Sequence, residues 1–158
     1  MSYRIGFGVD FHQLVAGRDL WLGGIKIPHT KGALGHSDAD VLLHAICDAI
    51  LGAACLGDIG VHFPDTNLKF KDIDSKILLK ESYALVKNKG YKIINIDSTV
   101  CLEEPKIKSF VPLMQEAIAS ILSIELDEIS IKATTTEKMG FIGNEEGLQA
   151  YATVLISR

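Results

Sequence analysis

The sequence is poor in cysteine, which argues against a scaffold held together by disulfide bonds. The only three are Cys47, Cys55 and Cys101, and no two of them form a CxxC pair. Three cysteines cannot all pair within one chain, and Cys47 and Cys55 lie in an apolar run with a helical pattern. We therefore expect buried, reduced thiols in a cytoplasmic protein. A catalytic thiol is the alternative.

The sequence also lacks a long apolar run and an excess of basic residues. A membrane-spanning helix needs about 20 consecutive apolar residues, and no such stretch occurs. The first ten residues, MSYRIGFGVD, show neither the apolar core nor the cleavage site of a signal peptide. The formal net charge is −4, whereas proteins that bind duplex nucleic acid usually carry a basic face. We expect neither a nucleic-acid nor a membrane partner.

What the sequence does contain is the composition of a globular domain. Of its 158 residues, 47% are hydrophobic and 23% are charged. This length suits one domain, residues 1–158, which can bury about two-thirds of its unfolded surface without a disulfide or a metal. A metal that this chain binds is therefore not required for folding and can take part in catalysis. The compact start at Met1 favours a bacterial cytoplasmic protein over a processed plastid protein.

The order of the expected elements predicts an α+β fold. Residue patterns predict strands at 3–9, 20–27, 91–102, 129–133 and 148–156, and helices at 39–56, 74–88 and 105–123. Loops are expected at 30–36, 58–67 and 134–147. The first strand is expected to be buried, with Phe7 and Phe11 inside it. This order predicts a mixed β-sheet covered by helices on one face.

The ends of the expected helices carry recognisable signals. Ser37 and Asp38 are the expected N-caps of the first helix, and Gly57 is well placed to end it. Pro105 is expected to open the last helix, because proline is tolerated in the first turn.

Three side chains form a candidate metal site. Asp10 and His12 lie two residues apart on one strand, so they point to the same side. His44 lies in the expected buried helix. Two imidazoles and one carboxylate leave a fourth position open, as in catalytic zinc sites, although a histidine satisfied within the core is the alternative. Asp48, one turn after His44, is expected to orient its ring, with Asp40 competing for that role.

Two further segments carry groups that can bind phosphate. His36 and Ser37 precede the first helix, whose free N–H groups can hold a phosphate, but a plain helix cap explains the same residues. The segment 133–138, ATTTEK, follows an expected strand. Its hydroxyls and backbone donors can grip a diphosphate, and Glu137 could hold magnesium against it. Turns use similar hydroxyl clusters, so both interpretations stay open.

Five motifs become specific when they are taken together in order. They are GxDxH at 8–12, GGIKIP at 23–28, HSDAD at 36–40, LGDIGVHFPDT at 56–66 and KATTTEKMGFIG at 132–143. Over nearly the whole chain they resemble the 2-C-methyl-D-erythritol 2,4-cyclodiphosphate synthase family of the non-mevalonate isoprenoid pathway. The resemblance implies a phosphorus–oxygen lyase. Its substrate would be 4-diphosphocytidyl-2-C-methyl-D-erythritol 2-phosphate, whose 2-phosphate attacks the β-phosphate to give the cyclic diphosphate and CMP.

The resemblance also implies roles for individual residues. Zinc (Zn²⁺) would be held by Asp10, His12 and His44, and a second metal, Mg²⁺ or Mn²⁺, would face Glu137. His36 and Thr135 match residues that stabilise the transition state. The implied contacts to the cytidine diphosphate substrate are Ser37, Asp58, Ile59, Gly60, Phe63, Pro64, Asp65, Thr66, Asn67, Leu102, Pro105, Lys106, Ile107, Lys108, Ala133, Thr134, Thr136 and Phe141. Within this set, 58–60 match the ribose site, 63–67 the methylerythritol pocket, 102–108 the cytosine pocket and 134–137 the diphosphate site.

The same resemblance implies a homotrimer with active sites between subunits. One chain would supply zinc and its neighbour the cytosine pocket. The family trimer encloses an apolar cavity that holds isoprenoid diphosphates, and Phe141 matches a residue there. Many members have a basic residue where this chain has Asn144, which Glu145 and Glu146 follow, so we do not expect this cavity to welcome an anionic head group.

Two other functions stay open. One is a zinc-dependent nucleotide diphosphate hydrolase, for which His36 is the only acid–base candidate. The other is a non-enzymatic trimer that binds nucleotide or isoprenoid ligands. Products discriminate among the three, since a hydrolase gives no cyclic diphosphate and a binding protein gives no turnover.

Overall fold

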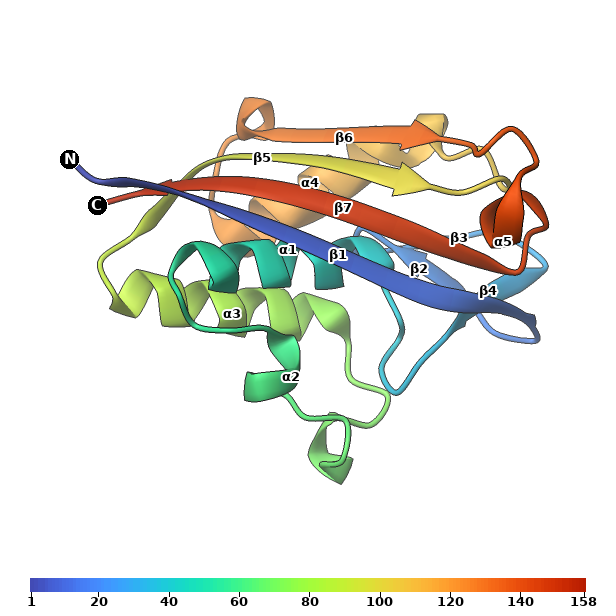
Figure 1. The fold of residues 1–158 in the computed structure, drawn as a ribbon, viewed down its shortest axis with the longest axis horizontal. Coiled ribbons are helices and arrows are strands. Elements are labelled where there is room, and N and C mark those ends of the chain that lie inside the picture. Colours follow the sequence, from blue (N-terminus) through green and yellow to red (C-terminus); the bar gives the residue numbers. More distant parts are fainter.

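A five-stranded mixed sheet organises the chain, and the computed structural model describes residues 1–158 (Figure 1). The strands are β1 (Tyr3–Ala16), β4 (Lys31–Leu34), β5 (Lys92–Cys101), β6 (Ile129–Thr134) and β7 (Gly147–Ser157). Their order across the sheet is β4-β1-β7-β5-β6. β5 and β6 run parallel, and the other neighbouring pairs run antiparallel. The predicted α+β class with a mixed sheet is confirmed.

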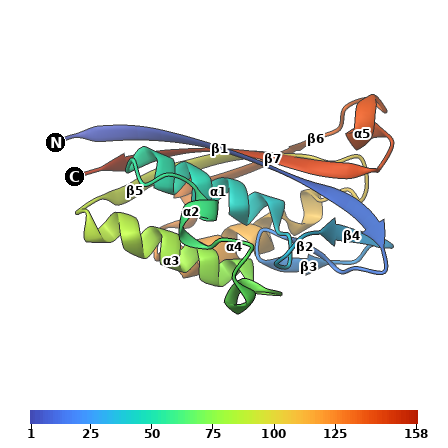
Figure 2. The same ribbon diagram turned by 60° about the horizontal axis from the view of Figure 1, so that its bottom comes forward.

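Three helices cover one face of this sheet (Figure 2). They are α1 (Val41–Ala53), α3 (Ser75–Asn88) and α4 (Val111–Leu122). Two shorter helices, α2 (Ile59–His62) and α5 (Gly140–Gly143), lie in the connecting segments, and single 3₁₀ turns occur at Leu68–Phe70, Lys108–Phe110 and Leu126–Glu128. No helix has both the length and the apolar character needed to cross a membrane. The predicted helical layer is therefore confirmed.

The prediction of a single strand at 20–27 is wrong, because this segment forms a hairpin. β2 (Leu20–Leu22) and β3 (Ile25–Ile27) pair antiparallel and form a separate two-stranded sheet. Gly23 and Gly24 between them both adopt positive φ, at 62° and 82°, a conformation that glycine reaches without strain. The backbone N–H groups of both glycines donate to the carboxylate of Asp40, which fixes the turn against the start of α1.

The expected loop at 30–36 also contains a strand. β4 pairs with the end of β1, with Gly32 opposite Val15. A side chain at Gly32 would meet the backbone carbonyl of Asp19 at 2.2 Å, so glycine here reflects close packing rather than a flexible loop. The loop expected at 58–67 contains the short helix α2.

Two helix starts differ from expectation. The N-cap of α1 is Asp40, whose carboxylate accepts from the Leu43 N–H, so Ser37 and Asp38 precede the cap. α4 begins at Val111 rather than at Pro105, and Pro112 occupies its first turn. Proline suits that turn because its missing N–H would have no helical partner there.

The outer face of the sheet is uncovered, and its part along β1 is apolar. β1 is longer than expected, and its Phe7 and Phe11 are 61% and 53% exposed, so the prediction that they are buried is wrong. Phe7 stacks on Tyr151 of β7 and Phe11 lies against Phe141 of α5, with ring centroids 6.1 and 6.4 Å apart. The buried core lies between the sheet and the helices, so nothing within this chain covers these aromatic rings.

Candidate active site

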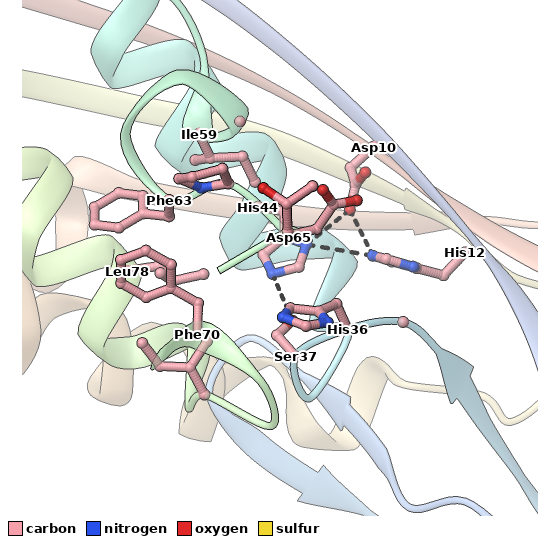
Figure 3. Close-up of a pocket in the computed structure, with 15 residues that line it drawn as sticks. Asp10, His12, His36, Ser37, His44, Ile59, Phe63, Asp65, Phe70 and Leu78 are labelled. Atoms are coloured by element: carbon pink, nitrogen blue, oxygen red, sulfur yellow. Dashed lines mark hydrogen bonds and ion pairs between the residues drawn. The ribbon is translucent and has the colours of Figure 1, made fainter. Parts of the chain in front are cut away.

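Asp10, His12 and His44 converge at one point (Figure 3). The Nε2 atom of His12 lies 2.9 Å from Asp10 Oδ2, and the Nδ1 atom of His44 lies 3.1 Å from the same oxygen. The two ring nitrogens are 3.3 Å apart. Asp10 and His12 share one side of β1, and α1 carries His44 to them, as the sequence predicts.

These three donors suit a metal ion in spacing and in chemistry. Ligand atoms at about 2.0–2.1 Å from a tetrahedral zinc ion lie about 3.3 Å from one another, close to the separations found here. The Nδ1 of His12 lies 3.0 Å from the carbonyl oxygen of Leu34. A carbonyl can only accept, so Nδ1 of His12 carries a proton, and in the neutral ring the lone pair of Nε2 faces the other donors. The chain therefore contains a potential metal-binding triad.

The triad is also strongly coupled electrostatically. Burial alone would raise the pKa of Asp10, but its hydrogen bonds to His12 and His44 and their charge outweigh burial and lower the pKa to about 2. Burial alone would lower the pKa of His44, but the hydrogen bond and charge of Asp10 outweigh that effect and raise it. The carboxylate therefore favours positive charge at this point, whether from a proton or from a metal ion.

A cavity of about 560 Å³ opens beside the triad. His36 and Ser37 line it next to the metal-binding residues, and the ring nitrogen Nε2 of His36 is buried with no hydrogen-bond partner in the chain. Phe63 and Phe70 line the side opposite His12 (Figure 3). Besides the triad, the cavity includes eight predicted site residues, namely His36, Ser37, Ile59, Gly60, Phe63, Pro64, Asp65 and Thr66.

Some predicted and some unpredicted residues define the edges of this cavity. Phe70, Ile73 and Leu78 line it without having been predicted, because their apolar side chains carry no chemical signal in the sequence. Asp58 and Asn67 do not line it but cap the short helical turns on either side of the loop. These two caps stabilise the conformation of the loop formed by residues 59–66.

The expected orientation of His44 by Asp48 is wrong. The Oδ1 atom of Asp48 accepts from the Ile59 N–H at 2.8 Å, which ties α1 to α2. Burial raises the pKa of Asp48, and the bond from Ile59 opposes that rise. Asp40 does not hold the ring either, because its carboxylate serves the β2–β3 turn and the α1 cap. Instead, the Nε2 of His44 meets the Oγ atoms of Ser75 at 2.8 Å and Ser37 at 3.2 Å.

The remaining predicted residues form a second group at the ends of β5 and β6. The Leu102 N–H donates to the Thr134 carbonyl at 3.0 Å, and the Thr136 N–H lies 3.4 Å from Oε2 of Glu103. These contacts join the segment that contains Pro105, Lys106, Ile107 and Lys108 to the one that contains Ala133, Thr135 and Glu137. None of these residues, nor Phe141 on α5, lines the cavity beside the triad. A single chain thus carries two separate groups of predicted site residues.

Comparison with known proteins agrees with the motifs. The model of the YgbB family matches residues 3–157. The chain is 63% identical to the 2-C-methyl-D-erythritol 2,4-cyclodiphosphate synthase of Bacteroides thetaiotaomicron over 158 residues, covering 100% of this chain and 99% of that protein.

Solved structures show the same fold. A 2C-methyl-D-erythritol-2,4-cyclodiphosphate synthase in its CDP-bound form gives a TM-score of 0.90 at 36% identity, covering 98% of this chain and 100% of that one. The bifunctional IspDF of Campylobacter jejuni gives 0.95 at 46% identity over 98% of this chain, which spans 42% of that longer protein. This chain therefore belongs to the YgbB family.

Proposed function

We propose that this chain is a 2-C-methyl-D-erythritol 2,4-cyclodiphosphate synthase of the non-mevalonate isoprenoid pathway. The substrate is 4-diphosphocytidyl-2-C-methyl-D-erythritol 2-phosphate. An oxygen of its 2-phosphate bonds to the β-phosphorus, the bond from that phosphorus to the bridging oxygen breaks, and CMP leaves with the electron pair. The observation that supports this proposal most strongly is the Asp10–His12–His44 cluster, which borders a cavity lined by residues of the 59–66 loop. The chain that carries this site belongs to the YgbB family.

Two metal sites follow from the donor sets. Asp10, His12 and His44 would hold Zn²⁺, since two imidazoles and a carboxylate without thiolate suit a catalytic zinc site with an open position. Glu137 would face Mg²⁺ or Mn²⁺, which prefer carboxylate oxygen and phosphate. When bound, these cations neutralise phosphate charge and polarise the β-phosphate.

The chain's own residues have mainly a positioning task. Nucleophile and electrophile belong to one flexible, anionic molecule, so catalysis depends on folding it back on itself rather than on covalent help. His36 and Ser37 lie beside the triad, where the unpartnered Nε2 of His36 can meet a phosphate oxygen. Phe63 and Pro64 give the cavity an apolar wall that suits the carbon chain of methylerythritol. No general base is needed, because a phosphate dianion is already a nucleophile.

The two separate groups of site residues support a complete active site formed between chains. We assign the segments 102–108 and 133–137 to the cytosine and diphosphate sites of a neighbouring subunit in a homotrimer, with Thr135 beside the reacting phosphates. The uncovered aromatic face around Phe7 and Tyr151 supports such an assembly, because monomers rarely expose contiguous apolar patches. The CDP-bound relative supports a cytidine nucleotide as ligand.

Phosphorus NMR of the purified protein with this substrate and Mg²⁺ tests the proposal. The expected result is a cyclic diphosphate signal together with CMP, suppressed by a chelator. His44→Ala should abolish turnover and lower the zinc content while leaving a folded protein. An uncyclised diphosphate with CMP would indicate a hydrolase instead, and a zinc-loaded protein without turnover would indicate a binding role.

A further inference from the structure

The His44 ring is held from both of its nitrogens, and only one of them belongs to the triad. Nδ1 faces Asp10 and His12, whereas Nε2 points to the hydroxyl of Ser75, 2.8 Å away. Ser75 is the first residue of α3 and is completely buried, and His44 is only 6% exposed. No bulk water competes for this contact, so the Ser75 hydroxyl determines whether Nε2 donates or accepts a hydrogen bond.

Asp38 in turn fixes the Ser75 hydroxyl. The Ser75 Oγ donates to Oδ1 of Asp38, and the Ser75 backbone N–H donates to Oδ2 of the same carboxylate at 3.0 Å. A carboxylate only accepts hydrogen bonds, so the hydroxyl proton of Ser75 points to Asp38. The oxygen of Ser75 then has only lone pairs to offer His44. Nε2 of His44 must therefore carry a proton, so that the nitrogen of the neutral ring that is free to bind a metal is Nδ1, which faces the triad.

The other hydroxyl near His44 is less well placed to set the ring. The Oγ of Ser37 lies 3.2 Å from Nε2 and already accepts from the Ala39 N–H at 3.0 Å. Ser75 is closer, and its proton is committed elsewhere. Ser37 borders the cavity, so its own hydroxyl proton remains available for a ligand.

The backbone around Asp38 and Ser75 is held in register independently of the two side chains. The Asp38 N–H donates to the carbonyl of Ile73 at 3.2 Å, and the Asp72 N–H donates to the carbonyl of His36 at 2.8 Å. These two bonds join the segment before α1 to the segment before α3. The second segment closes the loop that lines the cavity, so the contact with His44 connects the metal-binding ring to the substrate side of the site.

We propose that Asp38 and Ser75 form a positioning relay, Asp38–Ser75–His44, that sets the tautomer and orientation of His44 for metal binding. The inference rests on the proposed metal site at Asp10, His12 and His44. Ser75 acts through His44 and touches neither metal nor substrate. Outer hydrogen-bond partners of metal-binding histidines fix the ring and its tautomer in this way, and removing one lowers metal affinity about 10–100-fold.

Zinc affinity of Ser75→Ala, measured by competition with a chromogenic chelator, tests the relay without relying on turnover. Ser82→Ala is the matched control, because Ser82 is also completely buried on α3 but its Oγ has no hydrogen-bond partner. We expect Ser75→Ala to weaken zinc binding about 10–100-fold and Ser82→Ala to leave it unchanged. A titration with Co²⁺, followed by the visible absorption of the bound ion, should likewise show weaker binding to Ser75→Ala and unchanged binding to Ser82→Ala.

A second measurement uses the unaltered protein and so does not depend on the variant folding. In the zinc-loaded protein with ¹⁵N-labelled histidine, long-range ¹H–¹⁵N spectra should show the His44 proton on Nε2. A proton on Nδ1 would contradict zinc binding through that atom, and an Nε2 proton without the downfield shift of a hydrogen bond to Ser75 would overturn the relay.

The outcomes separate this inference from the proposed function. Equal zinc affinity in Ser75→Ala and the unaltered protein would overturn the relay and leave the metal site standing. Failure of the unaltered protein itself to bind zinc would contradict the metal site, and the relay with it. A fall in thermal stability of metal-free Ser75→Ala without a change in zinc affinity would show a merely structural serine and would also overturn the relay.

Discussion

Gly8 of β1 lies directly against the backbone of Ala45 in α1. A Cβ atom at Gly8 would stand 1.9 Å from the Ala45 carbonyl oxygen, a distance that no real contact allows. Gly6, one step earlier on the same side of β1, has the same relationship to Ala49, at 1.8 Å. Glycine on the strand and alanine on the helix thus let the two backbones meet. This close approach brings His44, the neighbour of Ala45, within reach of Asp10 and His12.

Gly8→Ala should therefore destabilise the protein and disturb the metal site together. The added methyl group must push α1 away from β1, and overpacking of this kind costs about 1–3 kcal/mol, occasionally more. Urea unfolding monitored by circular dichroism measures the loss, and chelator competition measures zinc affinity.

Gly52→Ala is the matched control for this change. Gly52 lies in the same helix but is exposed, and a Cβ there would meet nothing within 4 Å. Alanine favours the helix over glycine, so the control should gain about 0.5–1 kcal/mol. If Gly8→Ala were as stable as the unaltered protein, the close approach of α1 to β1 would be wrong.

Zinc affinity should rise with pH. Asp10 raises the pKa of His44 above its ordinary value of 6.5, outweighing burial, so the metal-free triad favours a protonated ring. In the metal-free protein this ion pair stabilises the fold below about pH 6.5, and the contribution is lost as pH rises through the raised pKa. Zinc needs the neutral ring, so binding displaces the proton and strengthens over the same range.

Competition titrations from about pH 6 to about pH 9 measure this dependence around the ordinary histidine value. Calorimetry in two buffers of different ionisation enthalpy counts the protons released. The expected result is tighter binding with increasing pH and net proton release near neutrality. Zinc affinity independent of pH would show that no proton leaves the triad on binding.

Asp48 should affect substrate binding more than the chemical step. Its carboxylate holds the Ile59 N–H at the start of the loop that lines the cavity. Asp48→Ala leaves that N–H without its partner, which should cost about 1 kcal/mol of stability and loosen the loop. Steady-state kinetics should show a higher KM with kcat nearly unchanged. Asp48→Asn keeps an acceptor oxygen and should restore most of the loss, and a fall in kcat alone would contradict this role.

The sequence predicted the parts of the fold that depend on local pattern and on residue chemistry. Alternation and helical periodicity located the long strands and the three helices, and the chemistry of Asp10, His12 and His44 identified the triad. The hairpin at Gly23–Gly24 was missed because the apolar residues on both sides of the two glycines predict one continuous strand. The strand at Lys31–Leu34 was missed because glycine in the segment 30–36 indicates a loop, whereas Gly32 here allows a close contact. Local sequence pattern cannot distinguish a glycine in a loop from one that allows a tight turn or a close backbone contact.

The partners of the site residues were less predictable than the residues themselves. Asp48 lies one helical turn from His44, and this spacing predicts that it orients the ring, yet the ring is held by Ser75, 31 positions away in the chain. Such contacts depend on how α3 packs against α1, which no local spacing encodes. Ser75 follows Asp74 at a helix start and has the pattern of an ordinary capping residue.

The uncovered aromatic face should determine the state of assembly. Phe7 is 61% exposed on the outer side of β1 and stacks on Tyr151, so a charge at this position would be buried wherever chains pack through this face. Phe7→Glu should therefore dissociate the proposed trimer, because an unpaired buried charge is strongly unfavourable. Sedimentation velocity measures the change, and turnover should fall with it, since the two groups of site residues would no longer meet. Ile77→Glu is the control, because Ile77 is 50% exposed on α3, on the opposite side of the sheet. Loss of assembly in both variants, or in neither, would contradict assembly through the aromatic face.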